Sequence, residues 1–302
     1  MALADTRNDI IDGALEAIGV KAADEDSNDA DVATAAKWLD RMVKRLQSTG
    51  AHLWTRNSAT LFISAGVFEY QIGGTADATE TYSESTTNVA AVALDKKIFV
   101  TSSSGVLEGD QFGVRLDDGT INFSAVTQVA ATFVVVTTGL VSAAASGNVC
   151  YFYTTRLEKA LRIPDARRKL SGQEISMIEM GRIDYLNLPN KDNQGTPVQY
   201  YYDPKQDTGD MFLWPSPAAD ETLITFSYYK PLDVFSDADD AAEFPDEWIE
   251  ALIMGLADRL FPIFAQPKPP GFREDAYQAI TDALDWDQGD ASIYLAPSKT
   301  RG

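Results

Sequence analysis

The sequence predicts an α+β fold in which a helical core carries short β-hairpins and an inserted small all-β barrel-like module. Three observations predict it. Apolar residues recur at helical spacing near both ends of the chain. Between residues 81 and 153 the composition shifts towards Val, Thr, Ser, Ala and Gly, with few helix-period segments. Within that stretch, Asp118-Gly119 lies between two apolar runs, which is a strong signal for a hairpin turn.

Two amphipathic helices are expected in the first 50 residues. Apolar side chains form one stripe from Ile10 to Ile18 and a longer stripe from Val32 to Leu46. Gly19 and Gly50 supply the expected helix ends, because glycine readily adopts the left-handed conformation of a C-cap. An acidic loop separates the two helices.

Short strands are expected after the helices, first as a hairpin and then as the β-module. The expected strands cover residues 61–63, 68–72, 109–116, 121–126, 132–138 and 148–153. The Asp118-Gly119 turn is predicted to be of type I′, which needs positive φ at both central residues. Five or six short strands favour a small barrel, because closure removes exposed sheet edges.

The last third of the chain is expected to mix helices and strands. A short helix is predicted before Pro189, and three strands follow at 198–202, 210–214 and 222–230. Another helix should begin near Pro245, because proline and acidic residues suit a first helical turn. A final helix then includes residues 276–287, before a small, polar tail.

The predicted division follows these patterns. Residues 1–80 form the N-terminal helical part of the core, 81–153 the inserted β-module, 154–290 the C-terminal part of the core, and 291–302 an extended tail. A length of 302 residues and a hydrophobic fraction of 45% suffice for two globular domains. No apolar run reaches the roughly 20 residues that a membrane helix needs, and the acidic start is not expected to be a leader.

Charge argues against a protein that wraps nucleic acid. The formal net charge is −20, whereas phosphate binding relies on clustered Lys and Arg. An acidic wall can still let DNA slide past, and solubility is the simpler reading of the same charge. One basic cluster, Arg167, Arg168 and Lys169, either contacts an acidic partner or DNA or pairs locally with carboxylates.

Catalytic patterns are largely missing from the sequence. The single cysteine, Cys150, has apolar neighbours and is expected to be buried, and the single histidine, His52, is expected to pack or lie at the surface. One Cys and one His cannot make the usual structural zinc sets. No phosphate loop, dinucleotide fingerprint or Gly-x-Ser-x-Gly elbow occurs. We therefore expect no enzyme, no cofactor and no metal.

A series of short motifs is more specific when taken in order. The series comprises Leu188-Pro189-Asn190-Lys191, Gly195-Thr196-Pro197, Tyr200-Tyr201-Tyr202-Asp203-Pro204, Leu213-Trp214-Pro215-Ser216-Pro217 and Phe244-Pro245-Asp246-Glu247-Trp248. With Gly50-Ala51-His52-Leu53-Trp54 and Tyr294-Leu295-Ala296-Pro297, this order and spacing resembles the tail accessory factor, or head-to-tail adaptor (head completion), family of short-tailed phages. The resemblance covers both flanks of the β-module but not the module.

The resemblance implies a structural virion protein with a helical adaptor core. Copies of the chain would form a ring, a dodecamer in the family pattern, beneath the portal protein. The ring would extend the DNA ejection channel and offer a docking surface to tail or nozzle proteins. Viral DNA would pass through without specific binding, and no membrane partner is implied. The location would be the head-tail junction of the virion, after assembly in the host cytoplasm.

The resemblance also implies where contacts lie. The C-terminal tail would reach the portal, which makes Ile293, Tyr294, Leu295, Ala296 and Pro297 the portal-binding candidates. Trp214 and Trp248 are candidate anchors of the subunit interface, with ordinary core packing as the alternative for each. No catalytic residue is carried over from the family.

Two other functions remain open at this point. The β-module could bind a host receptor or glycan, which would make the chain a host-binding virion protein. A carboxylate pair could instead hydrolyse cell-wall glycan, although 45 Asp and Glu residues guarantee that some pair lies at a suitable distance.

Overall fold

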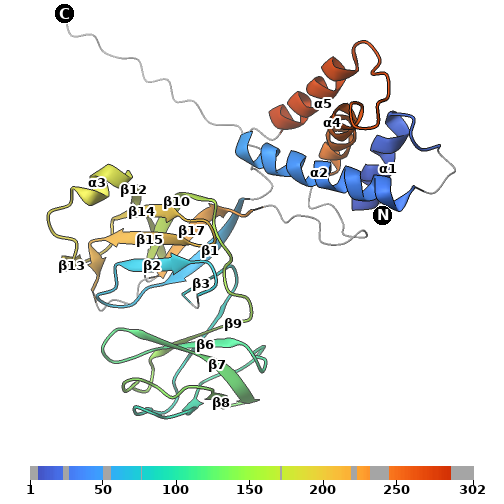
Figure 1. The fold of residues 1–302 in the computed structure, drawn as a ribbon. Helices are drawn as coiled ribbons and strands as arrows, with labels where there is room; N and C mark the ends of the chain where they lie inside the picture. Colours follow the sequence, from blue (N-terminus) through green and yellow to red (C-terminus); the bar gives the residue numbers. More distant parts are fainter. Residues whose placement is uncertain are drawn as a thin grey trace, which may run out of the picture. The chain divides into compact units, whose positions relative to one another are not determined.

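The structure is a computed structural model that describes residues 6–22, 27–49, 56–75, 77–170, 172–218, 223–231 and 245–286. The chain divides into two compact units. Unit 1 comprises residues 1–55 and 232–302, and unit 2 comprises residues 56–231. Long helices make up the described part of unit 1, and strands dominate unit 2 (Figure 1). The finer boundaries predicted after residues 80, 153 and 290 stay predictions.

Unit 1 is a small helical bundle. Its elements are α1 (Arg7–Ala17), α2 (Asp29–Thr49), the 3₁₀ turn η2 (Asp246–Trp248), α4 (Ile249–Leu260) and α5 (Phe272–Trp286). The apolar stripes predicted for the first two helices form its core together with α4, with Ile10, Leu39 and Leu256 fully buried. The two N-terminal helices and the helix that begins near Pro245 are therefore confirmed.

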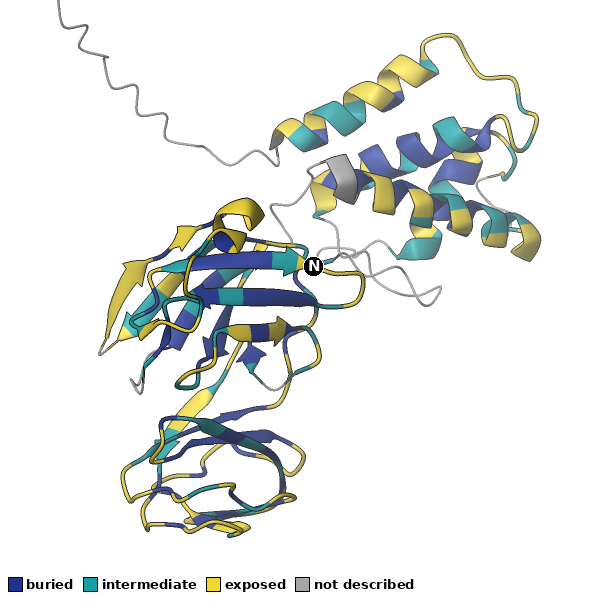
Figure 2. Ribbon diagram, turned by 60° about the vertical axis from the view of Figure 1, so that its left-hand side comes forward, coloured by how far each residue is buried: buried dark blue, intermediate teal, exposed yellow. Residues whose placement is uncertain are grey.

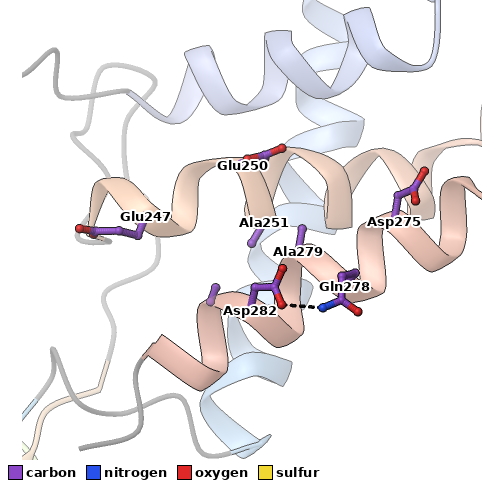
Figure 3. Close-up of a pocket in the computed structure, with 8 residues that line it drawn as sticks. Glu247, Glu250, Ala251, Asp275, Gln278, Ala279 and Asp282 are labelled. Atoms are coloured by element: carbon purple, nitrogen blue, oxygen red, sulfur yellow. Dashed lines mark hydrogen bonds between the residues drawn. The ribbon is translucent and has the colours of Figure 1, made fainter.

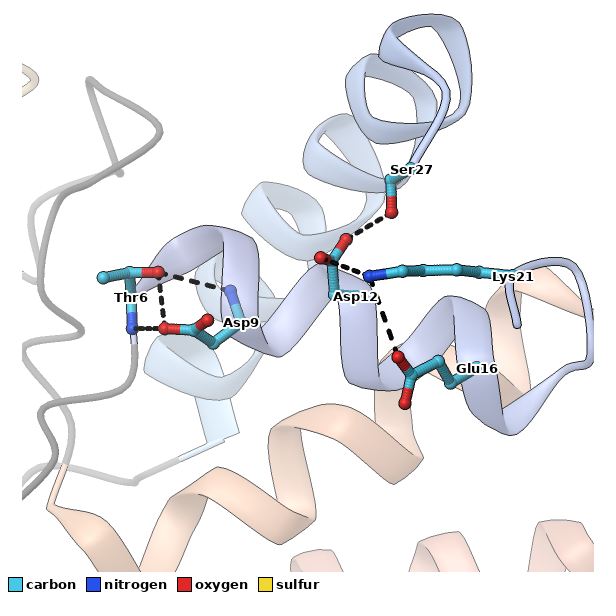
Figure 4. A network of polar contacts seen from close by, with 6 residues as sticks. All are labelled: Thr6, Asp9, Asp12, Glu16, Lys21 and Ser27. Atoms are coloured by element: carbon cyan, nitrogen blue, oxygen red, sulfur yellow. Dashed lines mark hydrogen bonds and ion pairs between the residues drawn. The ribbon is translucent and has the colours of Figure 1, made fainter. Parts of the chain in front are cut away.

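Polar contacts fix both ends of α1 (Figure 4). Thr6 Oγ1 accepts a hydrogen bond from the backbone of Asp9, while the Asp9 carboxylate accepts one from the backbone of Thr6, which makes a capping box. At the other end, Lys21 Nζ lies 2.6 Å from Asp12 Oδ2, and Ser27 donates to Asp12 Oδ1. These contacts tie the chain on both sides of α1 back to the helix.

Unit 2 contains two sheets that share one core. Their strands are β1 (Arg56–Phe62), β2 (Glu69–Ile72), β3 (Ala78–Thr79), β10 (Arg162–Leu170), β11 (Gln173–Ser176), β12 (Ile178–Glu179), β14 (Gln199–Pro204), β15 (Gly209–Trp214) and β17 (Leu223–Tyr229). One sheet has the order β11-β10-β17-β1-β3 and the other β12-β14-β15-β2. Leu61 and Phe226 from the first sheet pack with Tyr200 and Met211 from the second.

The predicted helical core is wrong, because the core of unit 2 outside the β-module is built between two sheets. β1 pairs antiparallel with β17 along its whole length, from Arg56 opposite Tyr229 to Phe62 opposite Leu223. The two segments expected as one hairpin do not pair with each other: β1 lies inside its sheet beside β17, and β2 is an edge strand beside β15, both far away in sequence. The helices of the described residues, apart from the short α3 (Arg182–Leu186), belong to unit 1.

The β-module is a six-stranded sheet within unit 2. Its strands are β4 (Ser83–Thr86), β5 (Lys97–Phe99), β6 (Gln111–Arg115), β7 (Ile121–Ala130), β8 (Phe133–Val136) and β9 (Val149–Tyr153), in the order β4-β9-β6-β7-β8-β5. A bridge between Thr87 and Val100 joins the ends of the two outer strands, so the sheet curls towards closure. Phe112, Val114 and Val134 are fully buried in its core.

The β6–β7 turn differs from its prediction. Gly119 has φ of +81°, but Asp118 is not among the described residues with positive φ, so the turn is not of type I′. The Asp118 carboxylate instead accepts hydrogen bonds from the backbone and hydroxyl of Thr120, at 2.9 and 2.6 Å. This local bond lets Asp118 keep negative φ and leaves the left-handed conformation to the glycine alone.

The β-module is joined to the larger sheet by a shared group of rings. The Phe62 side chain, at the end of β1, is fully buried against Tyr82, Phe123, Tyr151 and Tyr153, at ring-centroid distances of 5.3, 5.9, 4.7 and 5.7 Å. We call these five residues the aromatic cluster. The chain enters and leaves the module at one place, where Thr79 Oγ1 donates to the carbonyl oxygen of Thr155 at 2.7 Å.

Candidate functional site

The residues that the structure describes contain neither a reactive thiol nor a cluster that could hold a metal ion. Cys150 is buried, and burial raises the pKa of its thiol to about 12, so it stays protonated and unreactive. Among the described residues, no three His, Cys, Asp or Glu side chains are placed to hold a metal ion. His52 lies outside those residues. No helix among them is long and apolar enough to cross a membrane.

The motifs that carry the family resemblance between residues 188 and 217 form one local structure. β14 and β15 pair antiparallel, and the two-residue strands β13 (Gln194–Gly195) and β16 (Ser216–Pro217) pair beside them. Trp214 Nε1 donates to the carbonyl oxygen of Asn190 at 3.1 Å, and Ser216 N donates to that of Asn193 at 2.9 Å. The loop that carries the first motifs is therefore held against the strands that carry the last ones.

The predicted interface tryptophans have different surroundings. Trp214 is half-buried beside Tyr201 and Tyr185, at the edge of this motif region. Trp248 is 1% exposed within the core of unit 1. Their assignment to a subunit interface stays a prediction. The portal-binding candidates Ile293, Tyr294, Leu295, Ala296 and Pro297 lie outside the described residues.

The basic cluster predicted at residues 167–169 lies on β10. Arg167 Nη1 lies 3.6 Å from Glu174 Oε2 on the neighbouring strand β11, with both side chains about half exposed. For Arg167, this contact is the local pairing with a carboxylate that the sequence left open as one of two alternatives. A surface ion pair of this kind contributes little to stability, about 0–1 kcal/mol.

The helix α5 has an acidic stripe and a second stripe that is mostly apolar but includes an arginine, and its outer face is exposed (Figure 2). Residues three or four positions apart lie on the same side of a helix. One stripe contains Asp275, Gln278 and Asp282, and the other contains Arg273, Tyr277, Ile280 and Leu284. Each stripe lines a different groove with residues from α4.

The first groove, which we call the acidic groove, has a volume of about 430 Å³ and lies between α4 and α5 (Figure 3). Glu247 and Glu250 come from η2 and α4, and Asp275 and Asp282 come from α5. All four carboxylates are exposed, and Asp282 Oδ1 accepts a hydrogen bond from Gln278 Nε2 at 2.6 Å. The floor contains alanines, so the groove offers negative charge over a shallow, small-residue base.

The second groove, which we call the arginine groove, has a volume of about 360 Å³ and lies among α2, α4 and α5. Arg45, Arg259 and Arg273 line it, one from each helix. Burial, and then the nearby charge of Arg45, lower the pKa of Arg259, while the charge of Asp258 acts in the opposite direction. The acidic member of the lining, Asp258, forms an ion pair with Lys268 at 2.7 Å.

Apolar side chains complete the arginine groove. Leu46, Ile280 and Leu284 form its floor, and Tyr277 stands at its side with 72% of its surface exposed. The groove therefore suits a partner surface that combines acidic and small apolar groups. Neither groove is predicted by the sequence. The spacing of Asp275, Gln278 and Asp282 on one side of α5 was the available signal, but the contributions of α2 and α4 depend on packing.

Comparisons with known proteins add little to this geometry. No model of a protein family matches the chain, and no curated protein matches it. Among solved structures, the chain is similar to VP17, a capsid protein of bacteriophage P23-77, with 10% sequence identity, over 61% of this chain and 76% of that chain. The TM-score of this match is 0.13, and a likeness at that level carries no argument about fold or function.

Proposed function

We propose that this chain is a structural virion protein, a head-to-tail adaptor of the kind found in short-tailed phages. Copies of the chain form a ring beneath the portal protein, extend the DNA channel and provide the surface on which tail or nozzle proteins dock. The tail at residues 293–297 binds the portal. The protein acts at the head-tail junction and performs no catalysis.

The observation that carries the proposal is the order of the family-like motifs, supported by their packing. Pieces that are separated along residues 188–217 contact one another through Trp214 and Ser216 and share the β13–β16 and β14–β15 pairs. Motifs that build one local structure are a more specific likeness than motifs scattered over a surface. The acidic charge of the chain also suits a channel through which DNA passes without binding.

The proposal is tested by mixing the purified chain with the portal protein of the same virus. Negative-stain imaging and light scattering should find rings on the portal for the full-length chain. A chain that ends at Gly289 should lose docking. A control in which residues 290–302 are kept in scrambled order separates the motif from the mere presence of a tail, and it should also fail to dock. A full-length chain that ignores the portal would refute the adaptor proposal.

A second candidate function is host-receptor or glycan binding through the β-module, and one observation favours it. Leu94 has φ of +72° and is 83% exposed, and its backbone N donates to the carbonyl oxygen of Leu140, next to the 72% exposed Val141. A left-handed backbone conformation costs a leucine free energy, and strained conformations of this kind cluster at functional sites. A glycan array probed with the full chain tests this candidate. Glycan binding that Leu94→Asp abolishes would support it, and no binding by the full chain would count against it.

A further inference from the structure

The two grooves that flank α5 are complementary in charge. The acidic groove offers Glu247, Glu250, Asp275 and Asp282, and the arginine groove offers Arg45, Arg259 and Arg273. We propose that copies of this chain associate head to tail, with the acidic groove of one copy against the arginine groove of the next. This deepens the proposed function and rests on it, because a ring of adaptor subunits needs such a contact.

The charge of the whole chain makes the arginine groove unusual. The chain has 25 Lys and Arg residues against 45 Asp and Glu, so most surfaces of two copies repel each other. Three arginines from three helices nevertheless converge in one groove. An acidic surface of a second copy would offset the positive charges of Arg45 and Arg259, which lie close enough that the charge of Arg45 adds to burial in lowering the Arg259 pKa.

Both grooves also contain apolar side chains. Ala251 and Ala279 lie between the carboxylates of the acidic groove, and Leu46, Ile280 and Leu284 lie between the arginines of the other. Contact would cover the half-buried Ala279, Ile280 and Leu284, while charged pairs form around them. That arrangement matches an apolar centre with a polar rim, as in many protein interfaces.

Because the two grooves differ, a contact between them restricts the symmetry of the assembly. The contact joins two different surfaces, so it is heterologous, and an open assembly keeps one unused acidic groove at one end and one unused arginine groove at the other. A heterologous contact makes a ring when the rotation per copy closes and a filament when it does not. Both grooves lie in unit 1, and their lining residues come from its helices.

Two charge-reversed variants test the contact. The first is Arg45→Glu with Arg273→Glu, and the second is Glu250→Lys with Asp282→Lys, and all four side chains are exposed. Each variant alone should raise the protein concentration for half-assembly at least about tenfold, because like charges now face each other. An equimolar mixture should recover assembly, since every contact in an alternating ring again joins opposite charges. Matched controls are Lys37→Glu and Glu274→Lys, exposed positions that line neither groove.

Assembly is measured by light scattering and analytical ultracentrifugation, both for the chain alone and on the portal. Loss in each variant with recovery in the mixture supports the head-to-tail contact. Variants that assemble like the controls would overturn the contact but leave the adaptor proposal standing. A wild-type chain that stays monomeric and does not bind the portal would overturn both. Loss in both variants without recovery would also reject this pairing when their circular dichroism spectra match that of the wild-type chain.

Discussion

The aromatic cluster provides the most direct test of how the β-module is held to the rest of unit 2. We expect Phe62→Ala to weaken unit 2 strongly, because Phe62 is fully buried at the end of β1 and contacts rings from β4, β7 and β9 or their flanks. Truncation would leave four aromatic side chains around an empty space. It would also remove the side chain through which the core sheets and the module share buried surface.

The size of the effect follows from this burial. Truncating a buried phenylalanine to alanine costs about 3–5 kcal/mol of unfolding free energy, from lost burial and the cavity left behind. The tilted and edge-on ring contacts of Phe62, at 4.7–5.9 Å, place the expected loss in the upper part of that range. In a body of this size each kcal/mol lowers Tm by about 2–4 °C, so a fall of roughly 10 °C or more is expected.

Differential scanning calorimetry and urea titration of the full chain measure the loss. The matched control is Phe99→Ala, because Phe99 is 37% exposed and pairs edge-on with Phe133 at 6.0 Å, away from the aromatic cluster. That control should lose about 1 kcal/mol or less. If Phe62→Ala cost no more than Phe99→Ala, the aromatic cluster would not be what joins the module to the sheets.

Three further results are expected. A Cβ at Gly139 would lie 2.4 Å from the carbonyl oxygen of Leu94, so Gly139→Ala should cost about 1–3 kcal/mol, and an unchanged urea midpoint would contradict this clash. Burial raises the pKa of the Cys150 thiol to about 12, which leaves a thiolate fraction of about 10⁻⁴ at pH 8. Iodoacetamide should therefore label Cys150 only in denaturant, and mass spectrometry that finds rapid native labelling would disprove its burial. Burial raises the pKa of Asp77 above its ordinary value, so its protonated form favours folding and that contribution is lost as pH rises through the folded-state pKa. Asp77→Asn should raise Tm at about pH 7 and change it little at about pH 3, and melts that show equal shifts at both pH values would exclude this cause.

Local patterns in the sequence predicted elements well where one helix or strand buries one face. The stripe that includes Ile10 and Leu15 predicted α1, and the stripe that includes Leu39 predicted most of α2. The prediction of a helical core was wrong, because periodicity identifies an element but not its partner. β1 finds its partner in β17, more than half of the chain away, and no local pattern encodes that pairing.

The candidate site shows the same limit. The motifs between residues 188 and 217 were identified from the sequence, and the structure brings them together around Trp214. The arginine groove was not identified, since Arg45 and Arg259 come from helices at opposite ends of the sequence and meet only through the packing of α2 on α4. Stripes on a single helix such as α5 can be found by spacing, whereas sites built from several helices need the fold.

The pairing of Arg56 with Tyr229 has a mechanical consequence. The chain enters unit 2 at the start of β1 and leaves it at the end of β17, and these two ends are opposite each other in the same antiparallel pair. Tension between the two units therefore pulls on both strands from one end. Hydrogen bonds loaded in this way break one after another, as in opening a zipper, instead of sharing the load as they do in shear. The first rupture under force is expected at this end of the sheet, while the buried far end near Phe62 resists longest.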